Sequence, residues 1–97
     1  MRVIARKPLV QFANDHPDAR GGLEAWFQEA KAATWASSAD IKARYPSASI
    51  INNRRVVFNI CGNKFRLVAD INYLAKVVYI RFVGTHKEYD RIDVESI

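Results

Sequence analysis

The residues of this chain best suited to chemistry lie between positions 54 and 89. Arg66 and Arg81 occupy strand-like segments, and a polar cluster with His86 and Tyr89 follows directly. A guanidinium group binds phosphate oxygens through paired hydrogen bonds and stays ionised, whereas an imidazole exchanges protons near neutral pH. Cutting RNA without a metal requires a base for the ribose 2′-hydroxyl, an acid for the leaving oxygen and cations for the phosphate. These residue types therefore predict a site that holds and cuts a phosphodiester.

Four further side chains near this region are candidates for binding RNA: Arg55, Asn59, Lys64 and Lys87. Tyr89 is suited to orienting a group, donating a proton or stacking on a base. Simpler roles stay open for the same residues. Arg81 is equally suited to an ion pair with Asp70, and a single histidine after a strand is more often a surface or turn residue.

The positive charge of the chain is concentrated in its second half. The net charge is +5, from 15 Lys and Arg against 10 Asp and Glu. Residues 50–84 contain six basic residues and one acidic residue, so this stretch alone accounts for the whole excess. Such a basic surface attracts polyanions, although the pattern also fits a solvated face with no partner.

Composition indicates one globular domain, expected to span residues 1–97, without a cofactor. The sequence has no metal-ligand spacing and no glycine-rich phosphate loop, so no metal is expected. The single cysteine, Cys61, cannot form an internal disulfide, which fits a reducing compartment. Apolar runs are too short for a signal peptide or a membrane span, and we expect a cytoplasmic protein without membrane contact.

The first half of the chain predicts a strand and two or three helices, because apolar residues recur there at helical spacing. Proline both ends the first helix and opens the second. The predicted elements are a strand over Met1–Ala5, a helix over 7–15, a second helix from Pro17 with an apolar stripe reaching Thr34, a short helix from Ser37 or Ser38 to Tyr45, and a loop over 47–53.

The second half predicts three antiparallel strands joined by turns at Gly62-Asn63 and Leu74-Ala75. Alternation along each strand assigns one apolar set to the face beneath the helices: Val56, Phe58, Leu67, Ile80 and Phe82. The opposite face, called the open face below, is expected to centre on Arg66, with Arg81 diagonal to it and Asn59 beside it. Pairs expected in the second hairpin include Val68–Arg81, Leu67–Phe82 and Arg66–Val83.

These elements predict an α+β fold. An N-terminal strand and two to three helices pack on one face of an antiparallel sheet, in the order β-α-α-(α)-β-β-β.

Residues 50–93 also resemble a known family. The segments VVFNICGNKFRLV and RFVGTHKEYD look like the HigB-type toxins of bacterial type II toxin–antitoxin modules, a branch of the RelE-like ribonucleases. The resemblance implies an endoribonuclease, or mRNA interferase, that cuts translated message at the ribosomal A site through 2′-hydroxyl attack. By position in the motifs, it assigns catalytic or phosphate contacts to Arg66 and Arg81 and the C-terminal catalytic groups to His86 and Tyr89. It leaves the general base undetermined.

The same resemblance implies partners. A HigA-type antitoxin would neutralise the toxin, and the complex would bind operator DNA through the antitoxin. Two other readings of the sequence compete with an active ribonuclease. One is a non-catalytic basic module that binds RNA, and the other is a decayed toxin that only docks an antitoxin.

Overall fold

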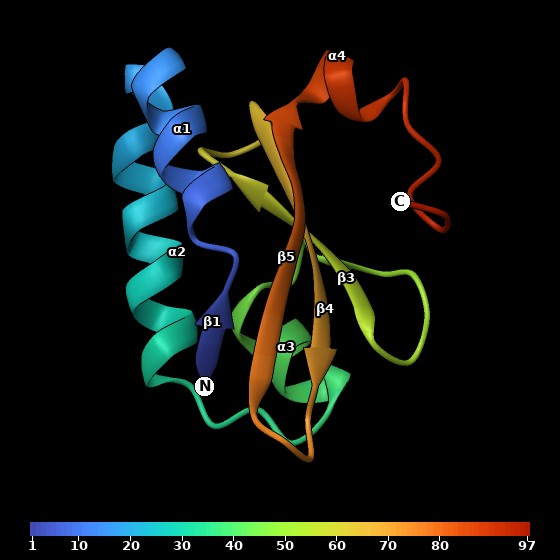
Figure 1. Ribbon diagram of the computed structural model, residues 1–97. Coiled ribbons are helices and arrows are strands. Elements are labelled where there is room, and N and C mark those ends of the chain that lie inside the picture. The colour runs from blue at the N-terminus through green and yellow to red at the C-terminus, as the bar shows by residue number, and fades with distance from the viewer.

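Five strands form one mixed sheet in the computed structural model, which describes all residues from 1 to 97 (Figure 1). The strands are β1 (Arg2–Ile4), β2 (Ser49–Ile50), β3 (Arg55–Ile60), β4 (Phe65–Asn72) and β5 (Val77–Thr85). Their spatial order is β1-β5-β4-β3-β2, and β1 runs parallel to β5 while the other neighbours are antiparallel. The predicted α+β class is confirmed. The predicted antiparallel sheet is corrected to a mixed one, because β1 joins its edge in parallel.

The helices fall close to the predicted ranges. They are α1 (Lys7–Asp15), the 3₁₀ turn η1 (Pro17–Ala19), α2 (Arg20–Ala32), α3 (Ser38–Arg44) and α4 (His86–Tyr89). Two predictions were wrong. The stripe of the second helix does not reach Thr34, because Ala33 takes an extended conformation and ends α2. The expected loop over 47–53 contains β2, which adds a fifth strand by pairing with β3.

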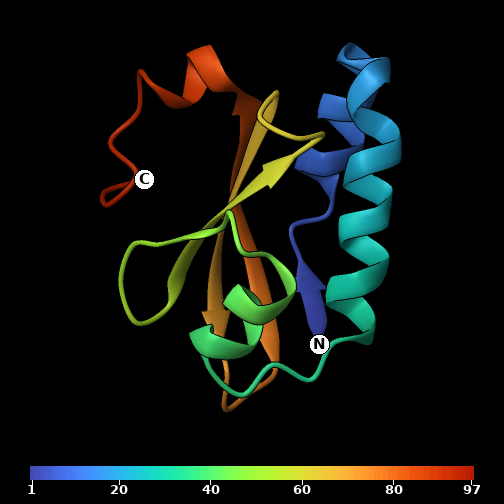
Figure 2. The ribbon, with the colours of Figure 1, turned by 180° about the vertical axis from the view of Figure 1, so that it is seen from behind.

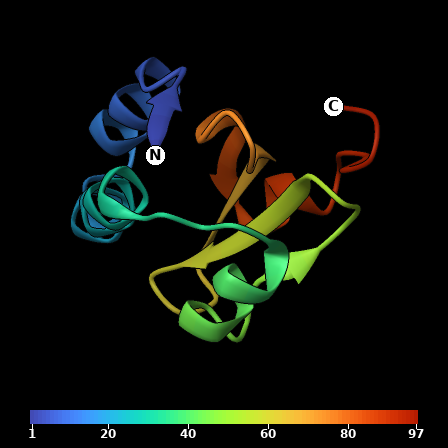
Figure 3. The same ribbon diagram turned by 90° about the horizontal axis from the view of Figure 1, so that it is seen from below.

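Helices cover one face of the sheet and leave the other to the C-terminal segment. Figures 1 and 2 show α1 and α2 side by side along the β1 edge. Figure 3 shows α3 and the C-terminal segment on opposite sides of the strands. No helix is both long enough and apolar enough to cross a membrane.

The core centres on Phe58 of β3, which is fully buried. Its ring centroid lies 5.3 Å from that of Trp26, 6.1 Å from Trp35 and 5.2 Å from Tyr45. These three rings come from α2, from the segment after it and from the end of α3, respectively. One strand residue therefore gathers the separate helical segments against the sheet, through aromatic packing that adds to simple burial.

The first hairpin has the predicted register. Residues from Arg55 to Ile60 pair with residues from Asp70 to Phe65, and Gly62 and Asn63 occupy the centre of the connecting turn. Gly62 has a φ of 68°, a conformation that glycine adopts without steric cost. The alternation of side chains along these two strands therefore predicted correctly which face of the sheet each side chain occupies.

The second hairpin follows the predicted register only as far as Ala69, which pairs with Ile80. Beyond it a β-bulge shifts the pairing, so Val68 faces Phe82 instead of Arg81. The expected pairs Val68–Arg81, Leu67–Phe82 and Arg66–Val83 were wrong for this reason. Because one extra residue reverses the facing of every later side chain, Phe82 turns to the open face. Val83 packs against the core in its place.

The bulge creates a close contact that only glycine permits at position 84. A Cβ atom on Gly84 would lie 2.4 Å from Cζ of Phe82 and 3.3 Å from Cβ of Glu88. The ring of Phe82 thus lies over the backbone of Gly84, beside the start of α4. This packing fixes the end of β5, from which α4 projects.

We expect Gly84→Ala to lower the free energy of unfolding by about 1–3 kcal/mol, because the Phe82 ring must move. Adding Phe82→Leu, which removes the clashing ring atoms, should recover most of that loss. Urea denaturation of the single and double variants measures both effects. Gly21→Ala is the control, since a Cβ atom there meets nothing within 4 Å and alanine favours the helix. Equal destabilisation by both alanine substitutions would contradict this account.

Candidate active site

The short helix α4 is fixed to the end of β5 by a capping box. The backbone N–H of Glu88 donates to Oγ1 of Thr85 at 3.1 Å, and the backbone N–H of Thr85 donates to Oε1 of Glu88 at 2.8 Å. The bond from the Thr85 backbone is the main reason that the pKa of the Glu88 carboxyl lies below its usual range. This reciprocal bonding satisfies the exposed N–H groups at the helix start and sets the direction of the polar residues that follow.

His86 stands at the start of α4 with its side chain 47% exposed. Its Nδ1 lies 3.1 Å from Oδ2 of Asp90, one helical turn further on. Its backbone N–H donates to the carbonyl oxygen of Lys64 at 3.2 Å, so α4 is also tied to the β3–β4 turn. The Asp90 carboxylate orients the imidazole and leaves Nε2 available to a substrate.

Asp90 was missing from the residues predicted for the site. The His86-to-Asp90 spacing of i, i+4 was the signal that could have found it, because such residues are neighbours on a helix. Because no helix was predicted over these residues, the four-residue spacing of His86 and Asp90 did not indicate a contact between them.

Arg66 and Tyr89 lie together at the same end of the open face. The guanidinium carbon of Arg66 is 5.9 Å from the ring centroid of Tyr89. Arg66 is only 8% exposed and is anchored to the turn, with Nη2 donating to Oδ1 of Asn63 at 2.7 Å and Nη1 to its carbonyl oxygen at 3.0 Å. Asn63, predicted only as a turn residue, thus holds the arginine in place. Nε of Arg66 makes no hydrogen bond within the protein.

Arg81 does not join this cluster. It is the extra residue of the bulge, and its Nε lies 3.6 Å from Oδ2 of Asp70. The alternative that Arg81 pairs with Asp70 is therefore confirmed. Asp70 lies four residues beyond Arg66 along β4, roughly 13 Å at about 3.3 Å per residue. The two arginines predicted to share one phosphate thus occupy opposite ends of the open face.

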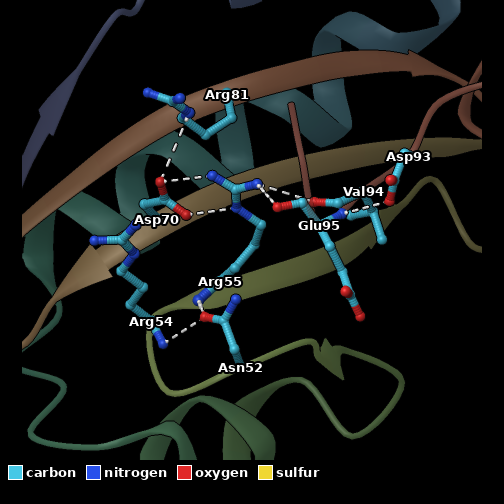
Figure 4. Close-up of polar contacts among 8 residues, drawn as sticks. All are labelled: Asn52, Arg54, Arg55, Asp70, Arg81, Asp93, Val94 and Glu95. Atoms are coloured by element: carbon cyan, nitrogen blue, oxygen red, sulfur yellow. Dashed lines mark hydrogen bonds and ion pairs between the residues drawn. The ribbon is translucent and has the colours of Figure 1, made fainter.

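Arg55 forms a buried ion pair with the same carboxylate (Figure 4). Its Nε donates to Oδ1 of Asp70 at 2.7 Å and its Nη2 to Oδ2 at 2.9 Å. These bonds from Arg55, more than the charges nearby, hold the pKa of Asp70 below its usual range. All three guanidinium nitrogens of Arg55 donate hydrogen bonds within the protein, so this buried side chain is not free for RNA.

The C-terminal segment is tied to the open face at Arg55. Nη1 of Arg55 donates to the carbonyl oxygens of Val94 and Glu95, at 3.0 and 3.2 Å (Figure 4). Val57 and Val68 belong to this face and lie outside the main core, yet they are 3% and 0% exposed. The middle of the face expected to be open is therefore buried.

The remaining candidates for RNA contacts differ in how free they are. The Asn59 amide donates to the carbonyl oxygen of Ser47 at 3.2 Å, beside Arg66 as predicted. Lys64 is 62% exposed and pairs with Asp18, whose hydrogen bond raises the pKa of the lysine. Lys87 is exposed on α4. Of these three candidates, only the two lysines present positive charge to solvent near His86.

The sequence is similar to that of a known toxin family over most of its length. Residues 19–92 match the model of the HigB toxin, described as the RelE-like toxic component of a toxin–antitoxin system. The chain belongs to the HigB toxin family. Its fold is the RelE-like one that the sequence motifs implied.

Two HigB relatives illustrate the range of similarity. The mRNA interferase toxin HigB of Escherichia coli K12 is 33% identical over 92 residues, which cover 93% of this chain and 88% of that protein. The mRNA interferase HigB of Escherichia coli O6:H1 is 22% identical over 94 residues, covering 95% and 91%. The similarity thus extends over nearly the full length of both proteins, including the N-terminal half that was less distinctive in sequence.

The ion pair of Arg55 and Asp70 gives a prediction about stability. Replacing Asp70 with Asn leaves a buried guanidinium without its counter-charge, and we expect a loss of about 3 kcal/mol at pH 7. Because the folded pKa of Asp70 lies below its ordinary value of 3.8, this stabilisation is present above pH 3.8 and is lost as the pH falls below it. The difference between wild type and Asp70→Asn should therefore shrink below that pH.

Urea denaturation at pH 7 and at steps down to about pH 2.5 measures this difference. Asp15→Asn, at an exposed position at the end of α1, is the matched control and should stay within about 0.5 kcal/mol of wild type. A difference between wild type and Asp70→Asn that is small at pH 7, or that grows in acid, would refute the assignment.

Proposed function

We propose that this HigB-family chain is a ribosome-dependent mRNA endoribonuclease that inhibits translation. The observation that carries the proposal is that His86, oriented by Asp90, lies at the same end of the sheet as Arg66 and Tyr89. Relatives at 33% identity bear the name mRNA interferase, which gives the substrate class. The remaining steps follow from the chemistry of these side chains.

The reaction proposed is metal-independent attack by the ribose 2′-oxygen. A base removes the 2′-hydroxyl proton, the 2′-oxygen bonds to phosphorus, and the bond from phosphorus to the 5′-oxygen breaks. The leaving oxygen takes a proton, so the products are a 2′,3′-cyclic phosphate and a 5′-hydroxyl end. His86 is the group that transfers a proton through Nε2, and Tyr89 orients the ribose or base beside it.

Arg66 supplies positive charge for the phosphate in this scheme. Its anchoring by Asn63 fixes the guanidinium before substrate arrives, so no side-chain freedom is lost at the transition state. The free Nε and the second hydrogen of Nη2 remain for phosphate oxygens. Lys64 and Lys87 bind flanking phosphates, at positions beside the turn and on α4.

The partners follow from the family. As the toxic component of a toxin–antitoxin system, the chain requires a neutralising partner, for which a HigA-type antitoxin is proposed. We place the toxin at the ribosomal A site, where the message is single-stranded and translated. Contact with operator DNA would occur only through the antitoxin in the complex.

We expect His86→Ala to reduce the rate of message cleavage by at least about 100-fold, since a positioned proton-transfer group contributes that much. The side chain is half exposed, so folding should be unaffected. Asp90→Asn, which keeps the shape but loses the charge, should give a smaller loss. Primer extension on message from cells expressing each variant without antitoxin measures cleavage, with growth arrest as a second readout.

Lys31→Ala on α2 is the control, because it removes an exposed charge on the helical side of the molecule. The cut ends should accept phosphate from polynucleotide kinase, as 5′-hydroxyl ends do. A wild-type protein that binds RNA but never cuts it on translating ribosomes would favour the non-catalytic RNA-binding module. Full toxicity of His86→Ala would reject the role given to this residue.

A further inference from the structure

A second basic pocket lies at the end of the open face away from α4. It is a cavity of about 680 Å³ beside the β4–β5 hairpin. Its lining includes Arg54 just before β3, Asp70 near the end of β4, and Tyr79 and Arg81 in the first half of β5. The catalytic scheme above uses none of these side chains.

The charges in this pocket do not balance. Three arginines surround one carboxylate, and Arg55 uses both oxygens of Asp70 in its own pair. Arg81 keeps only a 3.6 Å contact and is 45% exposed, and Arg54 forms no ion pair. In Figure 4 the guanidinium groups of Arg54 and Arg81 lie on either side of Asp70 and project away from Arg55. Arg54 is therefore free for an anion, and Arg81 can bind one through its Nη atoms while Nε keeps its contact with Asp70.

An aromatic ring accompanies these cations. Tyr79 pairs with Asp70 across the sheet and is 43% exposed, one of the few large apolar side chains left in solvent. An exposed ring beside free arginines suits single-stranded nucleic acid, because a base stacks on the ring while the guanidinium groups hold phosphate. A purely acidic peptide would use the cations but would leave the ring exposed.

We infer that this pocket binds one nucleotide of the substrate RNA outside the bond that is cut, with phosphate on Arg54 and Arg81 and the base on Tyr79. The inference rests on the proposed ribonuclease function and adds a contact with the RNA away from the bond that is cut. The buried Arg55–Asp70 pair positions Arg81 without competing for the ligand. The buried pair Val57 and Val68 lies between the pocket and the α4 end, so the RNA contacts the face at its two ends.

The test measures binding apart from cleavage. The probe is a fluorescent ten-nucleotide single-stranded RNA with 2′-O-methyl groups, which lacks the attacking hydroxyl. Anisotropy titrations give the Kd of wild type, Arg54→Gln, Tyr79→Ala and Tyr79→Phe. Lys7→Gln, at an exposed site on α1, removes the same charge as Arg54→Gln and controls for net charge.

We expect Tyr79→Ala to weaken binding at least about fivefold, the usual effect of losing one stacked base. Tyr79→Phe, which keeps the ring, should stay within about twofold of wild type. Arg54→Gln should weaken binding and reduce the slope of log Kd against log salt by about 0.7, the value for one phosphate on a single strand. Lys7→Gln should change neither quantity.

If the wild type does not bind the probe, or if all the proteins have equal Kd values, the proposal that this pocket binds RNA is overturned. Pocket variants that bind RNA normally but escape neutralisation by the antitoxin also overturn it, because the surface then faces a protein partner. A wild-type protein that binds this probe but does not cut unmodified message refutes the ribonuclease and leaves the pocket standing. The two claims therefore fail separately.

Discussion

The ion pair between Arg55 and Asp70 determines how the rest of the open face is arranged. Both side chains are largely withdrawn from water, and their fork geometry satisfies both carboxylate oxygens. The remaining Arg55 nitrogen donates to the carbonyl oxygens of Val94 and Glu95, which ties the C-terminal segment to the start of β3. Burying two charges gains little by itself, but removing one of them is costly. The pair thus acts mainly by specifying where the C-terminal segment lies.

The β-bulge at Arg81 is the second constraint on this face. By adding one residue to β5, it moves Phe82 away from the core and brings its ring over Gly84. It also leaves Arg81 beside Asp70 and far along β4 from Arg66. The bulge therefore separates Arg66 and Arg81, which the sequence had assigned to one phosphate. The groups proposed for proton transfer and charge neutralisation lie at the α4 end, whereas Arg54, Arg81 and the exposed Tyr79 lie at the other.

Much of the fold was predictable because local patterns and tertiary packing agree. Helix 7–15 and the register of the first hairpin follow from apolar periodicity and from a glycine that accepts a positive φ. The second hairpin was predictable only up to Ala69, since a bulge has no distinct composition and alternation cannot reveal it. Arg66, His86 and Tyr89 were placed in one region correctly. Asp90 and Asn63 were missed, because their roles depend on a four-residue helix and on a turn.

The sequence by itself determined the class of fold, the family and the residue types available for chemistry. Periodicity, charge and the motif around GTHKEYD are properties of neighbouring residues along the chain, and they survive without knowledge of packing. Only the tertiary structure decided which cations are free. Arg55 and Arg54 are adjacent and identical in type, yet one is buried against Asp70 and the other is exposed. Arg55 begins β3 directly opposite Asp70, whereas Arg54 precedes the strand and forms no ion pair. Burial therefore converts only Arg55 from a potential RNA contact into a structural ion pair.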